Sequence, residues 1–388
     1  MRILYCSWGE LIKDSCIDAM RSEGFTVEIL DFTVKKYDFD DEFQTVLKNA
    51  IRSGNYKGDA DEYIFSFNYF PDISRVANEE CITYISWVYD SPHLTLQSNT
   101  LNNRLNKVFL FDYALYEKYK LQGFTTVNYL PLPARIFKYP HKEFKHEISF
   151  VGNLYDGGQD QYGQINTFPD YLSGYMEAVI QAQERVYGYD IVEKMITDEV
   201  YEGVKKFVNA ELSENYRKCG KDIFEDMLRK RVTKNERIKV LSALGEKHRV
   251  DLFSETVNRS LPVNYMGVVD YSTKMPDVFS ESKINLNISL KSIRTGIPLR
   301  VMDILGAGGF CLTNYQAEIA EYFTNGEDLV WYENANEVAD IADYYLRHDS
   351  EREKIAMNGH RKVEELFSYK NMLKKMFEVF DGGSKCQR

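Results

Sequence analysis

The sequence lacks several features that would assign it to a class at once. Its 388 residues contain no apolar run near the ~18 residues that span a membrane. The opening segment Met1–Cys6 is too short, and too soon followed by polar residues, for a secretory signal. It has the pattern of a first β-strand. We therefore expect a cytoplasmic protein without a membrane span.

Cysteine and histidine are sparse. The six cysteines form no CxxC pair, and three of them lie in apolar runs typical of strands. This pattern excludes a disulfide scaffold and favours buried free thiols in a reducing compartment. The six histidines show no metal-ligand spacing. We expect neither a structural zinc nor another bound metal.

Positive charge is in deficit. The 48 Lys and Arg residues face 59 Asp and Glu, so the net charge is −11. Such a chain is a poor candidate for nucleic-acid binding, because the phosphate backbone requires clustered cations. The hydrophobic content of 44% is that of a globular protein and excludes a disordered chain. The 28 tyrosines fit either core packing or polar pockets that bind sugar rings.

The first third of the chain alternates short apolar runs with amphipathic segments such as Leu11–Ser22. This alternation predicts a parallel, doubly wound sheet. The Pro-containing stretch Leu130–Pro133 then forces extended chain, which makes it the natural domain boundary. We assign residues 1–139 to a first Rossmann-like domain. Its expected strands are Arg2–Cys6, Val27–Leu30, Glu62–Phe65, Ile82–Ser86, Lys107–Leu110 and Val127–Tyr129.

A second Rossmann-like domain is predicted at residues 140–388. It carries a polar helical insert at about 160–246, and its C-terminal helices are candidates for packing back on the first domain. The two domains would face a cleft at the carboxyl ends of their strands, where open α/β sheets bind ligands. The expected strands begin at Ile148 and continue with Val250–Phe253, Val263–Met266, Ile284–Asn287, Gly309–Leu312 and Leu329–Trp331.

A cationic loop precedes a predicted helix in this second domain. Lys291 and Arg294 follow the strand Ile284–Asn287, and the helix runs from Pro298 to about Leu305. Cations beside a helix N-terminus form an anion site, because free backbone N–H groups and the dipole both favour phosphate. That helix contains a further cation, Arg300, and Asp303, which could reach a ribose diol. Gly308 ends the helix. The alternative is a plain helix C-cap with solvated charges.

A second candidate segment follows the strand Ile82–Ser86 in the first domain. Asp90 could take a proton from an acceptor hydroxyl, and His93 could bond a sugar or a phosphate. The alternative is a turn in which Asp90 caps backbone N–H groups. In the first loop, Gly9 would allow close ligand approach. Glu10 is a second candidate base, but a charge at a helix N-terminus explains it better.

Short sequence motifs in both halves of the chain resemble those of GT-B glycosyltransferases. The resemblance is to the spore-maturation-protein-B-like branch of "glycosyl transferases group 1", and it leaves out only residues 160–246. The phrases that carry it are Trp87–His93, Ser149–Tyr155, Ile284–Asn287, Arg300–Asp303 and Gly306–Phe310, followed in order by Asn325–Glu327, Tyr345–Leu346 and Gly359.

The resemblance implies a hexosyltransferase with a nucleoside diphosphate donor, expected to be a UDP-sugar, bound mainly by the second domain. Relatives more often carry glutamate where this chain has Asp303, and a second glutamate where it has Thr295. We expect Lys291, Arg294, Arg300 and the backbone amides at the helix terminus to stabilise the leaving diphosphate in place of a metal. Further residues expected at the donor are Gly152, Asn153, Met266, Gly267 and Lys283. The alternatives are a glycine turn without a ligand at Gly152 and a solvated lysine at the end of a strand for Lys283.

Other functions are also compatible with the sequence. A nucleotide-sugar epimerase shares the architecture, and a non-catalytic sugar-binding or assembly protein would keep the fold without the chemistry. The acceptor is expected to be a protein or glycan, such as a flagellar or cell-surface component. The insert is a candidate lid, dimer surface or docking site for the acceptor. Asp38-Phe39-Asp40 has the letters of a DxD metal motif, but we interpret it as a charge cluster at a helix N-terminus.

Overall fold

The computed structural model describes residues 1–36, 39–138, 143–165, 167–208, 213–217 and 220–381. Among these, residues 1–133, 213–217 and 367–381 form a first compact unit, and the rest form a second. The division follows Pro133, ahead of the predicted boundary at 139, because Phe137 already bonds within the second unit: its N–H donates to the Gly306 carbonyl at 3.0 Å. Residues 139–142 lie outside the described residues.

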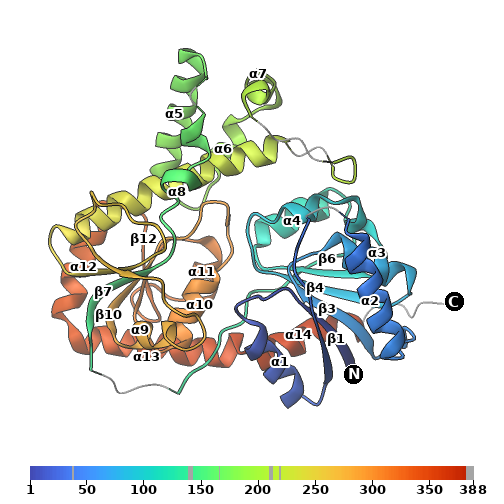
Figure 1. The fold of residues 1–388 in the computed structure, drawn as a ribbon. Helices are drawn as coiled ribbons and strands as arrows, with labels where there is room; N and C mark the ends of the chain where they lie inside the picture. The colour runs from blue at the N-terminus through green and yellow to red at the C-terminus, as the bar shows by residue number, and fades with distance from the viewer. Residues whose placement is uncertain (37–38, 139–142, 166, 209–212, 218–219, 382–388) are drawn as a thin grey trace. The chain divides into compact units, whose positions relative to one another are not determined.

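The first unit is a six-stranded parallel sheet in the order β2-β1-β3-β4-β5-β6 (Figure 1). Strands β1 and β3 to β5 are almost entirely buried, which explains their continuous apolar sequences. All six strands lie where the sequence predicts them. They are β1 (Arg2–Ser7), β2 (Thr26–Asp31), β3 (Glu62–Phe67), β4 (Thr83–Val88), β5 (Asn106–Leu110) and β6 (Val127–Tyr129).

Five helices pack on this sheet. The C-terminal helix α14 returns to the first unit, where Phe377 packs edge-on against Phe25 and Lys370 pairs with Glu23 at 2.8 Å. Asp40 caps α2, whereas Asp38 lies outside the described residues. The helices are α1 (Lys13–Ser22), α2 (Asp41–Ser53), α3 (Pro71–Glu79), α4 (Tyr113–Leu121) and α14 (Tyr369–Asp381).

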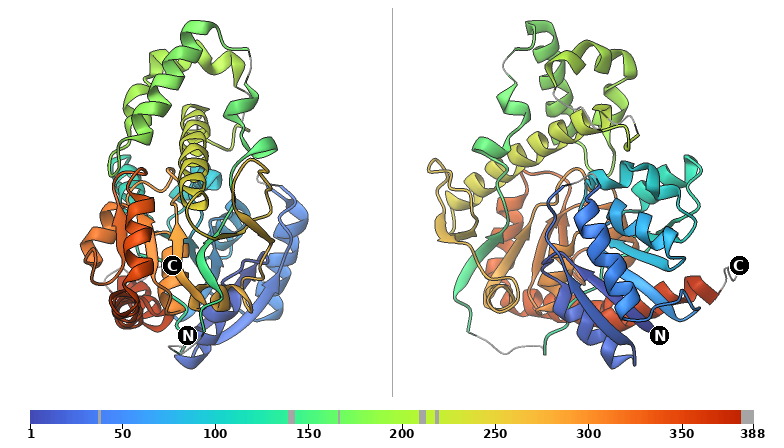
Figure 2. Two further views of the ribbon diagram at one scale, coloured as in Figure 1. Left: turned by 90° about the vertical axis from the view of Figure 1, so that its left-hand side faces the viewer. Right: turned by 45° about the vertical axis from the view of Figure 1, so that its right-hand side comes forward.

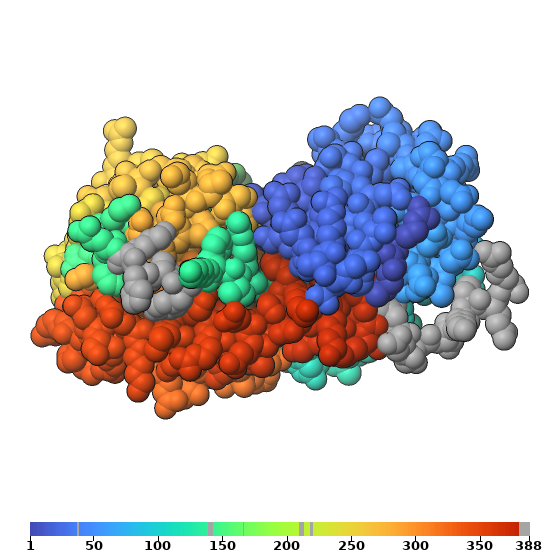
Figure 3. Space-filling view, turned by 90° about the horizontal axis from the view of Figure 1, so that it is seen from below, coloured from blue at the N-terminus to red at the C-terminus, as the bar shows by residue number. Residues whose placement is uncertain are grey.

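The second unit holds another six-stranded parallel sheet, in the order β12-β11-β10-β7-β8-β9. The prediction of two doubly wound α/β sheets is confirmed. Helix α13 covers one face of this unit, as the orange-red band in Figure 3 shows. The strands are β7 (His146–Val151), β8 (Val250–Phe253), β9 (Asn264–Gly267), β10 (Ser282–Asn287), β11 (Cys311–Asn314) and β12 (Val330–Tyr332). The helices are α9 (Met275–Ser280), α10 (Leu299–Gly306), α11 (Ala317–Tyr322), α12 (Val338–Arg347) and α13 (Asp349–Phe367).

The insert consists of α5 (Asp170–Glu184), α6 (Ile191–Met195), α7 (Asp198–Val204) and α8 (Gly220–Gly245). Helix α8 has 26 residues and is therefore about 39 Å long. Its last turns, with Val240 and Leu244, belong to the core of the sheet. Its first turns, with Phe224 and Leu228, join α5 to α7 in a separate apolar core. The insert thus rests on the part of α8 that extends beyond the sheet (Figure 2).

The structure also bears on the expected free thiols and on the expected lack of a membrane span. Cys6, Cys16 and Cys311 are buried free thiols, whereas the free thiol of Cys81 is exposed. Cys219 and Cys386 lie outside the described residues. No helix in the described part of the chain combines the length and the apolar character that crossing a bilayer requires.

Candidate functional site

The second sheet has a topological switch point between β7 and β10. The chain continues from β7 to β8 and β9 on one side, whereas β10 leads to β11 and β12 on the other (Figure 1). Loops that diverge in this way leave a crevice at the carboxyl ends of the two strands. The predicted residues Gly152 and Asn153 directly follow β7, and Ile288 directly follows β10.

Arg237 of α8 occupies this switch point. Its Nε and Nη2 donate to the Ile288 carbonyl at 3.2 and 2.5 Å, and its Nη1 donates to the Asn153 carbonyl. The guanidinium also lies 5.4 Å from the ring of Phe150 and 5.0 Å from that of Tyr155. Burial lowers the pKa of Arg237. No carboxylate of the described residues lies within ion-pair distance of Arg237, but the nearby Glu236 opposes the lowering of its pKa, so dipoles, rings and this one carboxylate together offset the positive charge.

The sequence analysis missed Arg237 because it lies in a polar helix. The sequence feature that could have identified Arg237 is its spacing to Val240, Leu241 and Leu244. These residues follow three, four and seven positions later and are all fully buried. Residues at these intervals share one face of a helix, so Arg237 had to point at the sheet. A charge on an otherwise apolar face indicates a specific role.

The loop after β7 is shaped by its own side chains. The Asn153 side-chain oxygen accepts hydrogen bonds from the Tyr155 N–H at 2.7 Å and from Thr256 Oγ1 at 3.3 Å. A side chain at Gly152 would place a Cβ 3.3 Å from the ring of Phe150. The two predicted residues therefore fix the backbone of the crevice, and Asn153 presents its carbonyl to Arg237.

The predicted cations Lys291 and Arg294 lie in the loop after β10, and both face acidic side chains. Lys291 Nζ is 3.2 Å from Glu236 Oε2 and 3.9 Å from the centre of the Tyr187 ring. Arg294 pairs with Asp190, at 3.2 Å, and with Glu193. Since Asp190 and Glu193 belong to the insert, the structure brings the predicted anion loop and the insert together.

The first turns of α10 carry a further polar cluster. Arg300 Nη1 is 3.2 Å from Asp303 Oδ2, and the Tyr271 hydroxyl donates to Asp303 Oδ1 at 2.8 Å. Burial raises the pKa of Asp303 to about 6, against the opposing effects of Arg300 and Tyr271. Tyr271 follows β9, whose end carries the predicted residues Met266 and Gly267. Gly267 has φ +77, and a Cβ there would meet open space.

Two predicted residues lie away from this cluster. Lys283 is the second residue of β10, so it stands at the amino edge of the sheet and not at the carboxyl edge. Gly308 has φ +77 and follows α10, which runs back from the carboxyl edge to the amino edge. The N–H of Gly308 donates to the Leu305 carbonyl at 3.0 Å, which closes the helix as a C-cap. The structure thus places both residues away from the cations after β10, and their contact with a donor stays a prediction.

In the first unit, Asp90 is exposed after β4 and is held by Asn68, a residue that sequence analysis missed. Asn68 Nδ2 donates to Asp90 Oδ2 at 2.6 Å, and Asn68 Oδ1 accepts from the N–H groups of Tyr89 at 3.1 Å and Asp90 at 3.3 Å. Asn68 is buried and has φ +59. A buried side chain on left-handed backbone that orients an exposed carboxylate is typical of a functional site.

His93 and Glu10 are engaged inside the first unit. His93 Nε2 lies 3.0 Å from the Tyr69 N–H and 2.7 Å from Thr95 Oγ1, and burial lowers the pKa of the ring. Its Nε2 is thus already bonded, and its predicted contact with a ligand stays a prediction. The buried Glu10 accepts from the Tyr5 hydroxyl at 2.6 Å and lies ahead of α1 without capping it. Gly9 has φ +90 and open space beside it.

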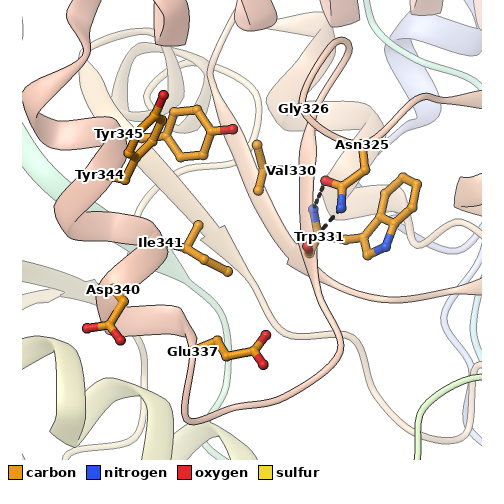
Figure 4. Close-up of a pocket in the computed structure, with 9 residues that line it drawn as sticks. All are labelled: Asn325, Gly326, Val330, Trp331, Glu337, Asp340, Ile341, Tyr344 and Tyr345. Atoms are coloured by element: carbon orange, nitrogen blue, oxygen red, sulfur yellow. Dashed lines mark hydrogen bonds between the residues drawn. The ribbon is translucent and has the colours of Figure 1, made fainter.

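A hollow on the second unit lies elsewhere, between β12 and α12 (Figure 4). It has a volume of about 540 Å³, and no predicted site residue lines it. Asn325 bonds the backbone of Trp331 there through both ends of its amide, at 2.9 and 3.3 Å. Within the described ranges, no group of three or more His, Cys, Asp or Glu side chains is arranged to hold a metal ion.

Comparison with known proteins bears on this geometry. Residues 221–378 match the family described as glycosyl transferase-like. The match begins in α8 and includes Arg237, the loop after β10 and α10. No curated protein sequence matches the chain significantly.

Solved structures share the two-unit fold at low sequence identity. Sucrose-phosphate synthase from Thermosynechococcus elongatus is 9% identical with a TM-score of 0.54, over 98% of both chains. HepE from Anabaena, in complex with UDP and glucose, is 10% identical with a TM-score of 0.53, over 99% of this chain and all of the other. TarM from S. aureus, in complex with UDP among other ligands, gives 9% and 0.51, over 87% of this chain and 59% of the other. The architecture is therefore GT-B, as the sequence phrases suggested.

Proposed function

We propose that the protein is a glycosyltransferase that moves a hexose from a nucleoside diphosphate donor, UDP-sugar by preference, to a hydroxyl of a protein or glycan. The observation that carries the proposal is the glycosyl transferase-like match at residues 221–378. This range contains the β10 side of the switch-point crevice and Arg237, which supplies a buried positive charge there. The sequence phrases further support a place in the spore-maturation-protein-B-like branch.

The donor would bind at the carboxyl edge of the second sheet. In the proposed reaction, the bond between the anomeric carbon and the diphosphate oxygen breaks, and negative charge grows on the leaving diphosphate. Arg237, Arg300 and the cations after β10 would stabilise that charge without a metal, because charge fixed in a water-poor site needs no reorganisation. Asp303 would accept a hydrogen bond from the ribose.

The acceptor would bind against the first unit. There Asp90 takes the proton of the attacking hydroxyl, and Asn68 keeps the carboxylate in place through the bond at 2.6 Å. The exposed position of Asp90 suits contact with an acceptor. The buried thiols of Cys6, Cys16 and Cys311 support action in the cytoplasm, where such thiols stay reduced.

The test is release of nucleoside diphosphate. The protein is incubated with UDP-glucose, UDP-galactose, UDP-N-acetylglucosamine and a GDP-sugar, with and without glycan acceptors, and liberated UDP or GDP is measured. We expect release from at least one donor, and at least a hundredfold loss in Asp90→Asn. Asp18→Asn, an exposed carboxylate on α1, is the matched control and should retain full activity. Absence of both turnover and nucleotide binding would refute the proposal, and an isomerised free donor would indicate an epimerase instead.

A further inference from the structure

The insert contacts the predicted anion loop through ion pairs. Asp190 and Glu193, on and beside α6, engage Arg294, and Glu236 of α8 engages Lys291. Carboxylate and phosphate oxygens are the same kind of acceptor for a guanidinium or an ammonium group. The acidic side chains therefore occupy the positions that the phosphate oxygens of a donor would take on these two cations.

The space beside these pairs is small. A cavity of about 30 Å³ separates the end of α5 and α6 from the loops after β10 and β11, and Tyr187, Lys291 and Arg294 line it. A cavity needs roughly 10–15 Å³ of such space to hold one water molecule, so this one has room for about two. A diphosphate is several times larger, so it can bond Lys291 and Arg294 here only if the acidic side chains withdraw.

The acidic side chains have alternative partners when they withdraw. Asp190 already bonds Arg229 at 2.7 Å, and Glu236 accepts from the hydroxyls of Tyr187 at 2.8 Å and Tyr332 at 2.9 Å. The Glu193 side chain is 28% exposed, so water can solvate it. When these pairs open, Asp190 keeps Arg229, Glu193 is solvated, and Glu236 keeps two hydroxyl donors on Oε1 while its buried Oε2 loses Lys291. The main cost of the exchange therefore falls on Glu236.

We propose that the insert competes with the donor for Lys291 and Arg294, and that donor binding releases the segment 186–195 from the anion loop. Occupancy of the donor site is thereby linked to the position of the insert. The inference rests on the proposed function, because the competing ligand is the diphosphate of the donor. Asp190 and Glu193 are accordingly positioning residues that act through Arg294.

The first test is UDP affinity measured by titration calorimetry on the full chain. Glu193→Gln removes a competing charge, and we expect UDP to bind about five to ten times more tightly. Glu199→Gln, an exposed carboxylate on α7, is the matched control and should bind UDP as the unaltered protein does. Arg294→Gln should weaken binding at least tenfold. An unchanged affinity in Glu193→Gln, with a melting temperature equal to that of the control, would overturn the proposal.

The second test is hydrogen exchange with and without saturating UDP. We expect faster exchange of the amides of 186–195 when UDP is bound, and unchanged exchange in α13. Most ligands slow exchange near their site, so an acceleration is a signature that a static structural role of the ion pairs would not produce. If UDP binds and these amides slow or do not change, the competition is refuted. If neither UDP nor GDP binds the unaltered protein, the proposed function itself fails.

Discussion

Asn68 offers a quantitative test of how the first unit holds Asp90. Asn68→Ala removes three side-chain hydrogen bonds and leaves an alanine at φ +59. The half-buried Tyr89 N–H loses its partner at a cost of about 1–3 kcal/mol, whereas water can reach the exposed Asp90. Left-handed backbone costs alanine roughly 1 kcal/mol more than asparagine or glycine. We therefore expect the free energy of unfolding to fall by about 3 kcal/mol.

Two comparisons separate these contributions. Asn68→Gly avoids the backbone cost, so it should be about 1 kcal/mol less destabilising than Asn68→Ala. Asn55 is exposed, has φ +53, and makes no side-chain bond among the described residues. Asn55→Ala should therefore show the backbone cost alone, about 1 kcal/mol.

The assay is urea unfolding followed by tryptophan fluorescence, since Trp8 and Trp87 lie in the first unit. Activity should fall at least tenfold in both Asn68 variants, because the Asp90 carboxylate loses its amide donor, and should stay unchanged in Asn55→Ala. An Asn68→Ala protein as stable as Asn55→Ala would refute the assigned hydrogen bonds. Full activity in both Asn68 variants would refute the role of Asn68 in positioning Asp90.

Two further predictions concern the second unit. Arg237→Met leaves the carbonyls of Asn153 and Ile288 without their donors, so we expect the free energy of unfolding to fall by about 2–4 kcal/mol in thermal unfolding and UDP to bind at least tenfold more weakly. Arg259→Met, at an exposed arginine, should change neither quantity. An Arg237→Met protein that is equally stable and still binds UDP would contradict the role assigned to Arg237. The pKa of Asp303 is raised to about 6 in the folded protein, so the folded state binds the proton more tightly and stability falls as pH rises from about 4 to 6, by up to about 3 kcal/mol. Asp303→Asn should flatten that part of the pH–stability curve, and an unaltered slope would show that Asp303 does not titrate as described.

The strands could be predicted because buried parallel strands have continuous apolar sequences that need no knowledge of their neighbours. Runs such as Ile148–Val151 and Ile284–Asn287 have this pattern, and the structure pairs them in parallel with Phe150 opposite Leu286. The expectation of a polar insert held for the same reason, because its residues lack the apolar runs of a strand. The local sequence pattern was sufficient to predict an element wherever that segment's own composition determines whether it is buried.

The site could be predicted only in part, because its contacts join residues far apart in the sequence. Arg237 bonds the carbonyl of Asn153, 84 residues away, and no spacing of residues in the sequence predicts this contact. Arg294 pairs with Glu193, 101 residues away, so a cation that looked free for phosphate has a partner. Gly308 lies away from the cations after β10 for a geometric reason: the eight residues of α10 carry the chain about 12 Å, from one edge of the sheet to the other.

The amide of Asn325 has a consequence for self-association. Strand β12 is an edge of the second sheet, and a bare edge presents N–H and C=O groups that recruit strands from other molecules. Asn325 satisfies the N–H and the C=O of Trp331 itself, as the dashed lines in Figure 4 mark. The side chain thus takes the place of a neighbouring strand at the middle of a three-residue edge. A second copy of the chain cannot extend this sheet at Trp331, so this edge is protected against fibrous, strand-on-strand growth.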